Sequence, residues 1–402
     1  MLFNIKLEEA QDTLLSRTAP LPGETLPLLQ ALGRIAARDL FADSDLPSCP
    51  QAVVDGYAVG AYDKHARNSY VITERLQPGA IASLPLGPGQ AAGVATGSEL
   101  PAGTVAVVAH ETTRLEGERV ILLEEILPGD NIRQPGEAFH SGELLVSRGA
   151  SLSPGRISVL AAFGKHKVTV FRRPRVAVLS LGGGIVSYHA TPQPGQRRDS
   201  NGPLLAALAL QDGAQVTKVE VTGDENASTL KEHLENLLCQ ADLLITTGGA
   251  ASGVYDQAIH MLKHIGAQLL FWGVKIKPGS HSGAAIGNDK LMIALSGNPA
   301  ACAAGYHLLA APVLRALQGL EPYPQLISAT CTNSYIKEGG PRRFLQGVAV
   351  CDHKGWSVTI LPGQKSSMLQ ALTQSNALID LPAGCPPVEK GQNVPIVLLH
   401  GK

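Results

Sequence analysis

One stretch of the chain combines residue types and spacing that suit the binding of an oxyanion. Leu243–Thr247 is a short apolar run ending in two threonines, and the glycine-punctuated loop Gly248–Gly253 follows it. Apolar residues around Leu262 then recur at helical spacing. This order predicts a buried parallel strand, a tight loop and the start of a helix. Backbone N–H groups at a helix N-terminus lack intrahelical partners and favour an anion, so we expect a phosphate or another oxyanion here.

Nearby charged residues favour this interpretation over a plain turn. A βα turn that needs glycine for positive φ is the simpler explanation of an isolated Gly-Gly pair. Here Asp256 lies just past the loop, and Lys275 and Lys277 follow two elements later. A lysine ammonium group can neutralise an oxyanion. We therefore treat these three residues as candidates for the same site.

Length and composition indicate a soluble protein with several domains. The 402 residues exceed what one hydrophobic core usually supports, which suggests two to four domains. Hydrophobic residues make up 44% and charged residues 17%, as in globular proteins. The net charge is −1, without a long basic block, which argues against non-specific nucleic-acid binding.

Cysteine usage and hydropathy bear on the compartment. The six cysteines are scattered, with no Cys-x-x-Cys spacing, as expected of reduced thiols in the cytosol. The N-terminus lacks a signal-peptide layout, and no apolar run is long enough to span a membrane. We expect a cytoplasmic protein that does not bind membranes.

The elements that must position these residues can be outlined from the pattern. Leu7, Ala10 and Leu14 share one face of a predicted helix, and a second short helix is predicted around Thr25–Leu32, capped by Thr25. A small all-β module follows, to about residue 137. Its predicted strands are Tyr70–Glu74, Gln90–Ala95, Val105–Val108 and Val120–Leu123.

Arg175–Leu317 alternates predicted strands with helices, which indicates a parallel sheet covered on both faces. Ligands bind such sheets at the carboxyl ends of the strands. Gly182–Gly184, Thr247–Gly253 and Ser296–Asn298 all fall at such ends, and Asn298 is a predicted helix cap. After Glu321 the pattern is again of β type and predicts a small barrel.

Several short motifs occur in one order along nearly the whole chain. They are Asp55-Gly-Tyr-Ala-Val59, Thr96-Gly-Ser-Glu-Leu-Pro-Ala-Gly103, Arg133-Gln-Pro-Gly-Glu137, Arg172-Arg-Pro-Arg-Val-Ala-Val-Leu-Ser180, Arg198-Asp-Ser-Asn201, Thr247-Gly-Gly249, Ile276-Lys-Pro-Gly279, Ser296-Gly-Asn-Pro299, Gly363-Gln-Lys-Ser-Ser-Met-Leu369 and Asn376-Ala-Leu-Ile-Asp-Leu-Pro382. Each motif alone is weak. Together they closely resemble the MoeA/gephyrin E-domain family, the molybdopterin molybdenumtransferases.

The resemblance implies a multidomain fold of α/β and β parts. It implies a split helical N-terminal domain (1–44 and 138–172), an inserted β domain (45–137), a molybdopterin-binding three-layer α/β/α domain with a mostly parallel sheet (173–320) and a C-terminal β-barrel (321–402). Members form homodimers. Their reaction inserts molybdate into adenylated molybdopterin, releases AMP and leaves molybdenum cofactor, assisted by a divalent cation, usually Mg²⁺. The implied partners are the molybdopterin adenylyltransferase and molybdoenzyme apoproteins.

The resemblance also assigns roles to individual residues. Asp55, Asp256, Lys277 and Thr96 match catalytic positions, and Asp55, Asp256 and Asp224 match metal-binding acids. Arg342 matches the molybdate side of the C-terminal domain. The implied residues for binding the pterin substrate and molybdate are Thr247, Gly248, Gly249, Ser252, Gly253, Lys275, Pro278, Gly279, Ser296, Gly297, Asn298, Arg343, Ser366 and Ser367. An exposed loop aspartate is otherwise a turn former or cap, and an arginine pair before a strand is otherwise surface charge.

Polar residues of the family pattern are missing at five positions, which are Ala138, Gly183, Gly184, Val254 and Ser280. Ala138, Gly183, Gly184 and Val254 stand where the family has acids, and Ser280 replaces a lysine. A magnesium site needs several oxygen ligands, so losing acids would weaken it. Two functions therefore stay open: a molybdenumtransferase, and a weakened paralogue that binds or carries molybdopterin or molybdenum cofactor.

Overall fold

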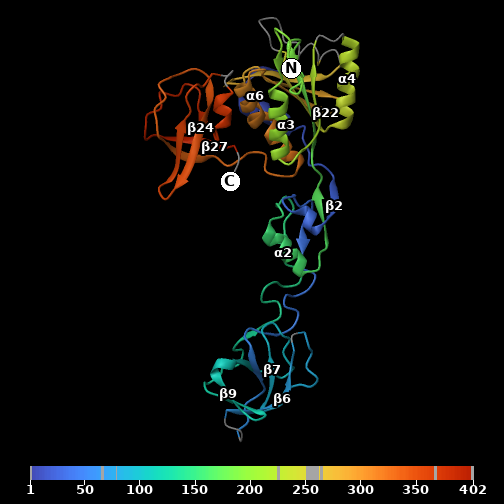
Figure 1. Ribbon diagram of the computed structural model, residues 1–402, viewed down its shortest axis with the longest axis vertical. Coiled ribbons are helices and arrows are strands. Elements are labelled where there is room, and N and C mark those ends of the chain that lie inside the picture. Colours follow the sequence, from blue (N-terminus) through green and yellow to red (C-terminus); the bar gives the residue numbers. More distant parts are fainter. Residues whose placement is uncertain are drawn as a thin grey trace. The chain divides into compact units, whose positions relative to one another are not determined.

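A computed structural model describes residues 2–64, 68–77, 79–223, 227–249, 262, 266–365 and 369–399. The chain divides into two compact units (Figure 1). Unit 1 consists of residues Met1–Thr25 and Thr169–Lys402, and unit 2 of Leu26–Val168. Each unit is built around its own β structure.

A seven-stranded sheet forms the centre of unit 1. Its order is β1 (Leu2–Ile5), β19 (Gln268–Val274), β21 (Gly283–Gly287), β22 (Lys290–Leu295), β18 (Leu243–Gly248), β14 (Arg175–Leu181) and β17 (Gln215–Thr222). All neighbours run parallel except β21, which is antiparallel to β19 and β22. The mostly parallel sheet predicted from the sequence is confirmed. The pattern gave no signal for β21, because its sequence Gly-Ala-Ala-Ile-Gly has low β-propensity.

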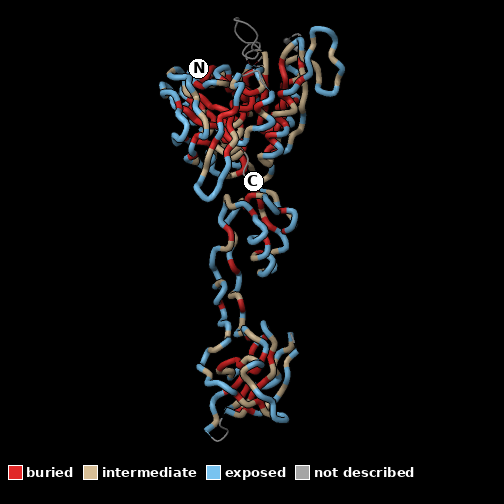
Figure 2. Tube along the Cα trace, turned by 60° about the vertical axis from the view of Figure 1, so that its left-hand side comes forward, coloured by how far each residue is buried: buried red, intermediate tan, exposed pale blue. Residues whose placement is uncertain are grey.

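Helices cover both faces of this sheet and complete three layers (Figure 1). One core joins α1 (Leu7–Leu15), α3 (Asn201–Gln211), α6 (Pro299–Gly305), η3 (Tyr306–Ala310) and α7 (Ala311–Leu317) to the sheet. A second core lies under α4 (Ala227–Gln240). Buried residues are concentrated in the interior of unit 1 (Figure 2). The continuous helix Pro299–Leu317 is apolar and long enough to cross a membrane, but most of it is buried in this core.

The C-terminal part of unit 1 is a closed barrel of five strands. They are β23 (Ile327–Cys331), β24 (Arg342–Asp352), β25 (Gly355–Ile360), β26 (Ala377–Leu381) and β27 (Asn393–Leu398). The order β24-β25-β23-β27-β26 closes because β26 also pairs with β24. A sixth short strand, β20 (Ile276–Lys277), extends the sheet from the α/β part. The predicted barrel is confirmed.

Unit 2 contains a six-stranded sheet and a smaller part built around one helix. The sheet has the order β8 (Ala106–Ala109), β5 (Gly56–Val59), β7 (Gln90–Val94), β6 (Ser69–Arg75), β10 (Arg119–Leu122) and β9 (Thr113–Glu116). Short pairs link β4 (Gln51–Ala52) to β11 (Ile132–Arg133) and β3 (Leu40–Phe41) to β12 (Leu144–Val146), and the helix is α2 (Pro154–Ala162). The predicted β module is confirmed.

The helix predicted around Thr25–Leu32 is wrong. Thr25 lies in strand β2 (Gly23–Pro27), which pairs with β13 (Lys167–Phe171), and only the short 3₁₀ helix η1 (Leu28–Ala31) follows. Isolated helices of this length are marginal in water, and pairing with a distant strand outweighs local propensity.

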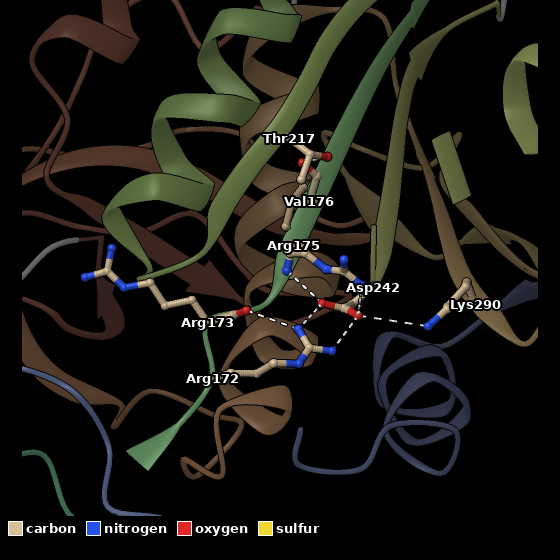
Figure 3. A network of polar contacts seen from close by, with 7 residues as sticks. All are labelled: Arg172, Arg173, Arg175, Val176, Thr217, Asp242 and Lys290. Atoms are coloured by element: carbon tan, nitrogen blue, oxygen red, sulfur yellow. Dashed lines mark hydrogen bonds and ion pairs between the residues drawn. The ribbon is translucent and has the colours of Figure 1, made fainter. Parts of the chain in front are cut away.

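A buried carboxylate holds the amino ends of β14 and β18 (Figure 3). Asp242, just before β18, accepts hydrogen bonds from Arg172 Nη1 at 2.6 Å and Nη2 at 2.8 Å, and from the Arg175 backbone N–H at 2.9 Å. The side chains of Arg175 and Lys290 also lie within ion-pair distance. Burial raises the pKa of Asp242, but hydrogen bonds from Arg172 and Arg175 lower it overall to about 2. These contacts hold the segment before β14 against the segment before β18.

Candidate functional site

One asparagine links the carboxyl ends of β18 and β22. Asn201 is the first residue of α3, and its amide Nδ2 donates to Thr247 Oγ1 at 3.0 Å and to the Gly297 carbonyl at 2.8 Å. Thr247 Oγ1 donates in turn to the Ser296 carbonyl at 3.0 Å. The predicted loops at Thr247–Gly249 and Ser296–Asn298 are therefore cross-linked, as expected for strand ends that share one edge of a parallel sheet.

The orientation of the Asn201 amide follows from these bonds. A carbonyl oxygen only accepts, so the atom beside Gly297 must be the nitrogen. The Asn201 side chain is buried, with 8% of the residue exposed, and no described residue donates a hydrogen bond to its Oδ1. A buried amide oxygen without a donor costs about 1–3 kcal/mol. The unsatisfied oxygen therefore lowers the stability of the folded protein locally, at the ends of β18 and β22.

Backbone approaches explain the glycines in these loops. Gly248 has φ +89°, and a Cβ there would lie 2.4 Å from the Leu181 carbonyl oxygen. A Cβ on Gly297 would lie 3.1 Å from the Gly248 Cα. Only glycine lets the loops pack this closely.

The expectation of free N–H groups needs correction at Gly249. Its N–H donates to the Leu181 carbonyl at 3.1 Å and so is not available to an anion. Among the described residues, Gly297 is the better candidate, because it is exposed and its N–H has no hydrogen-bond partner there. Asn298 does occupy the predicted N-cap of α6, but its side chain makes no capping hydrogen bond. Ser252 and Gly253 lie outside the described residues.

Sequence reasoning assigned no role to Asp199, which the structure places inside this cluster. Asp199 is buried and accepts from Ser180 Oγ at 2.7 Å, from the Asn201 N–H at 3.0 Å and from the Gly202 N–H at 2.9 Å. The N-terminus of α3 thus already holds a carboxylate of the chain itself. The signal was present, because Asp199 belongs to the motif Arg198-Asp-Ser-Asn201.

The predicted cationic segment lies beside the first turns of α6. Lys275 and Lys277 are exposed, and neither pairs with an acid of the described chain. Pro278 follows through a cis peptide bond, and Gly279 has φ +102° with its carbonyl accepting from Ser282 Oγ at 2.9 Å. The backbone is therefore well held while both ammonium groups remain available.

Strand pairing brings a second cation to Lys277. β20 and β24 run parallel, with Ile276 opposite Arg342 and Lys277 opposite Arg343. Residues opposite each other in a sheet project to the same face. Arg343 is 7% exposed and donates Nη1 to the Gly339 carbonyl. In the described ranges it has no carboxylate partner, which is unfavourable for a buried charge unless an anion joins it.

Arg342, the neighbouring arginine, does not fit the anion-binding role that its motif suggested. Nε and Nη2 donate to Asp380 at 2.7 and 2.6 Å, and Nη1 donates to Glu8. Its guanidinium also lies 5.2 Å from the Phe344 ring centre. All three nitrogens are engaged by the protein, and the hydrogen bond to Asp380 leads the causes that raise the pKa of Arg342. The twin arginines therefore have different roles.

A small pocket lies on the Phe344 side of the same strand. Its lining includes Pro278, Phe344, Gln346, Gln364 and Lys365. The side-chain amide of Gln364 bridges to the backbone of Gln346 in both directions, at 3.1 and 2.9 Å. Ser366 and Ser367 come next in the chain but lie outside the described residues.

Asp55 and Thr96, two predicted catalytic residues, meet in unit 2. The Thr96 N–H and hydroxyl donate to Asp55 Oδ1 at 2.7 and 2.8 Å. These bonds, led by the backbone N–H, hold the pKa of the Asp55 carboxyl below its usual value, and the nearby charge of His110 adds to the effect. Asp55 is therefore an exposed carboxylate that is ionised, with Oδ1 fixed in direction.

A magnesium site does not emerge from the described part of the chain. No group of three or more His, Cys, Asp or Glu side chains there could hold a metal ion. Asp199 has its oxygens occupied by protein donors, and Asp224 and Asp256 lie outside the described residues.

Comparison with known proteins gives a consistent assignment along the chain. Residues 5–164 match the MoeA N-terminal region (domain I and II), 177–316 match a probable molybdopterin-binding domain, and 328–399 match the MoeA C-terminal region (domain IV).

Curated relatives and a solved structure agree. A molybdopterin molybdenumtransferase of Staphylococcus epidermidis is 31% identical over 98% of this chain and 95% of its own length. One of Staphylococcus aureus is 30% identical over the same shares. The crystal structure of a molybdopterin biosynthesis MoeA protein from Pyrococcus horikoshii has a TM-score of 0.86 at 26% identity, covering 99% of this chain and 100% of that one.

Proposed function

Because the chain belongs to the MoeA family of molybdopterin molybdenumtransferases, we propose that it inserts molybdate into adenylated molybdopterin and releases AMP. The product is molybdenum cofactor. The observation that carries the proposal is the pair of cations Lys277 and Arg343. Strand pairing places them opposite each other, and among the described residues neither forms an ion pair with a carboxylate.

Molybdate is a tetrahedral dianion, and a paired lysine and arginine suit it. Arg343 supplies a rigid fork of donors, and Lys277 supplies a mobile point charge at the exposed side. Lys275 adds a further positive charge two residues away. We assign molybdate to this pair, with Pro278 and Gly279 shaping the backbone and Ser366 and Ser367 as proposed neighbours.

The pterin substrate and its phosphates are proposed to bind the strand-end loops. Thr247, Gly248 and Gly249 form one wall, and Ser296, Gly297 and Asn298 form the other. The support is the cross-link through Asn201 and the exposed Gly297 N–H. A loop held this firmly loses little entropy when a ligand binds. Ser252 and Gly253 keep their proposed place in this site.

Asp55 and Thr96 are proposed to act together at the reacting phosphates. Thr96 uses both its N–H and its hydroxyl to orient one oxygen of Asp55, so the other oxygen is left to face substrate or a cation. A hard cation such as Mg²⁺ prefers carboxylate oxygens and water. Magnesium dependence therefore remains part of the proposal, with Asp55, Asp224 and Asp256 as the acids concerned.

A second function, binding or carrying the cofactor, remains a candidate because acids of the family pattern are absent from this chain. Ala138 and Gly184 are exposed, and a Cβ on Gly184 would meet only the Gly195 carbonyl at 3.7 Å. Sterics therefore do not explain the missing acids. A paralogue that binds or carries molybdopterin or molybdenum cofactor would keep the cations and loops while catalysing slowly.

We also propose a cytoplasmic homodimer. Unit 2 exposes Leu29, Leu32, Phe41 and Leu144, and Phe41 pairs with Leu144 across β3 and β12. Exposed apolar side chains of this size fit a surface that another chain covers. The molybdopterin adenylyltransferase and molybdoenzyme apoproteins are the proposed functional partners.

Molybdate-dependent release of AMP from adenylated molybdopterin by the purified chain is the test of this function.

A further inference from the structure

Arg342 is held by two carboxylates that come from different parts of unit 1. Glu8 belongs to α1, which packs in the α/β core, whereas Asp380 belongs to β26 of the barrel. Asp380 is 6% exposed and chelates Arg342 through Nε and Nη2. The Glu8–Arg342–Asp380 triad therefore links a helix of the α/β part to the barrel.

The triad lies at the point where the two parts of unit 1 join their sheets. Arg342 is the first residue of β24 and pairs with Ile276, one position before the Lys277–Arg343 pair. On the other side of β24, Asp380 of β26 pairs with Phe344. The Arg342 guanidinium therefore lies next to the β20–β24 pairing that places Lys277 opposite Arg343.

The β20–β24 pairing is short. It covers only two residue pairs at the end of β24, so few backbone hydrogen bonds hold its register. A slip of one residue would turn Arg343 to the opposite face of the strand, away from Lys277. An ion triad fixed to both a helix and a neighbouring strand would prevent that slip.

We propose that Arg342 is a positioning residue: through Glu8 and Asp380 it holds β24 in the register that sets Arg343 beside Lys277, without contacting the anion itself. The inference rests on the proposed function only in naming that anion as molybdate. A purely stabilising triad would change the resistance to unfolding and leave anion affinity alone. The two roles therefore differ in a measurable way.

The test measures molybdate binding by calorimetry, with sodium molybdate and the full chain. The variants are Asp380→Asn, Glu8→Gln and Arg342→Lys. A matched control is Glu116→Gln, which breaks the exposed Arg114–Glu116 ion pair of unit 2. Asp380→Asn is expected to weaken binding at least tenfold, which is about 1.4 kcal/mol. Arg342→Lys keeps the positive charge, so it should weaken binding by less. Glu8→Gln should give a smaller loss, and Glu116→Gln none.

Hydrogen exchange at the amides of residues 276–277 and 342–345 gives a readout that needs no ligand. These amides should exchange at least tenfold faster in Asp380→Asn than in the wild type, while β14 and β18 stay unchanged. Glu8→Gln removes an exposed carboxylate, so it reports even if Asp380→Asn does not fold.

The outcomes separate the two ideas. If the wild-type chain does not bind molybdate, the proposed anion site fails, and the exchange rates alone decide the positioning role. If folded variants bind molybdate like the wild type, or their β20 and β24 amides exchange at wild-type rates, the positioning role is overturned.

Discussion

Lys277 and Arg343 lie opposite each other across the parallel pairing of β20 and β24, although 65 positions separate them in the chain. One side chain comes from the α/β part and the other from the barrel. Arg343 is buried and Lys277 exposed, so the pair offers one fixed and one mobile donor. An anion that binds both would also complete the pairing of a buried charge.

Lys277→Met should weaken molybdate binding by roughly ten- to a hundredfold, because a hydrogen bond to a charged group is worth about 1.5–3 kcal/mol. Calorimetry with molybdate measures the change, and rising salt should reduce the wild-type affinity. Lys354→Met is the control, since Lys354 is exposed in the turn between β24 and β25. If both variants lose the same affinity for molybdate, the loss comes from the change in net charge and not from a contact made by Lys277.

Asn201→Ala and Thr247→Val should each weaken binding of adenylated molybdopterin, and the double variant should lose less than the sum. The reason is that both side chains act in one hydrogen-bonded chain between the two loops. Coupling of about 0.5–3 kcal/mol is typical of such contacts. Binding titrations of the three variants form the cycle, and strictly additive losses would mean that the loops are not joined through these bonds.

The sequence predicted the elements whose residues carry a local pattern, and it missed those that depend on distant partners. The apolar run Leu243–Thr247 and the helix face formed by Leu7, Ala10 and Leu14 are examples of such local patterns. β20, with two residues, and β21, rich in glycine and alanine, become strands only by pairing. At Thr25 the local pattern indicated a helix, but the structure has a strand there, because β2 pairs with β13.

The same division applies to the site. The motifs proposed Lys277, Asp55 and Thr96, but they could not show which of two adjacent arginines lacks a carboxylate partner in the described ranges. Arg342 and Arg343 look equivalent in the sequence, and only the positions of Glu8 and Asp380 separate them. Only the structure shows that Asn201 Oδ1 has no donor among the described residues.

Asp242 should make unit 1 sensitive to acid. Its pKa is about 2 in the folded protein, against 3.8 as the ordinary value, so the unfolded chain binds more protons between these limits. The stabilisation, about 2 kcal/mol, is present above pH ~4 and is lost as the pH falls toward ~2. Both tryptophans, Trp272 and Trp356, lie in unit 1 and report its unfolding by fluorescence.

The comparison variant is Asp242→Asn. Wild-type unit 1 should be clearly more stable than the variant at pH 7 in urea titrations, and the difference should shrink as the pH drops. A difference that stays constant down to pH ~2 would show that the ion pairs with Arg172 are not the cause.

Restoring acids should raise turnover more than affinity. Ala138→Asp and Gly184→Glu are both sterically allowed, since both positions are exposed and Gly184 has room for a Cβ. Restored oxygen ligands would act on the reacting phosphates and so appear in kcat. Steady-state kinetics of the double variant at several magnesium concentrations checks this. An unchanged kcat with good binding would place the deficit at Val254 or Ser280.

The decisive experiment for the proposed activity mixes the purified chain with adenylated molybdopterin, magnesium and molybdate, and measures AMP and finished cofactor together. The cofactor is scored by its ability to activate a molybdoenzyme apoprotein. We predict that AMP appears only when molybdate is present, in step with active cofactor, and that Lys277→Met needs more molybdate for the same rate. Tight binding of the adenylate with no AMP at any molybdate concentration would contradict the molybdenumtransferase assignment and leave the carrier function.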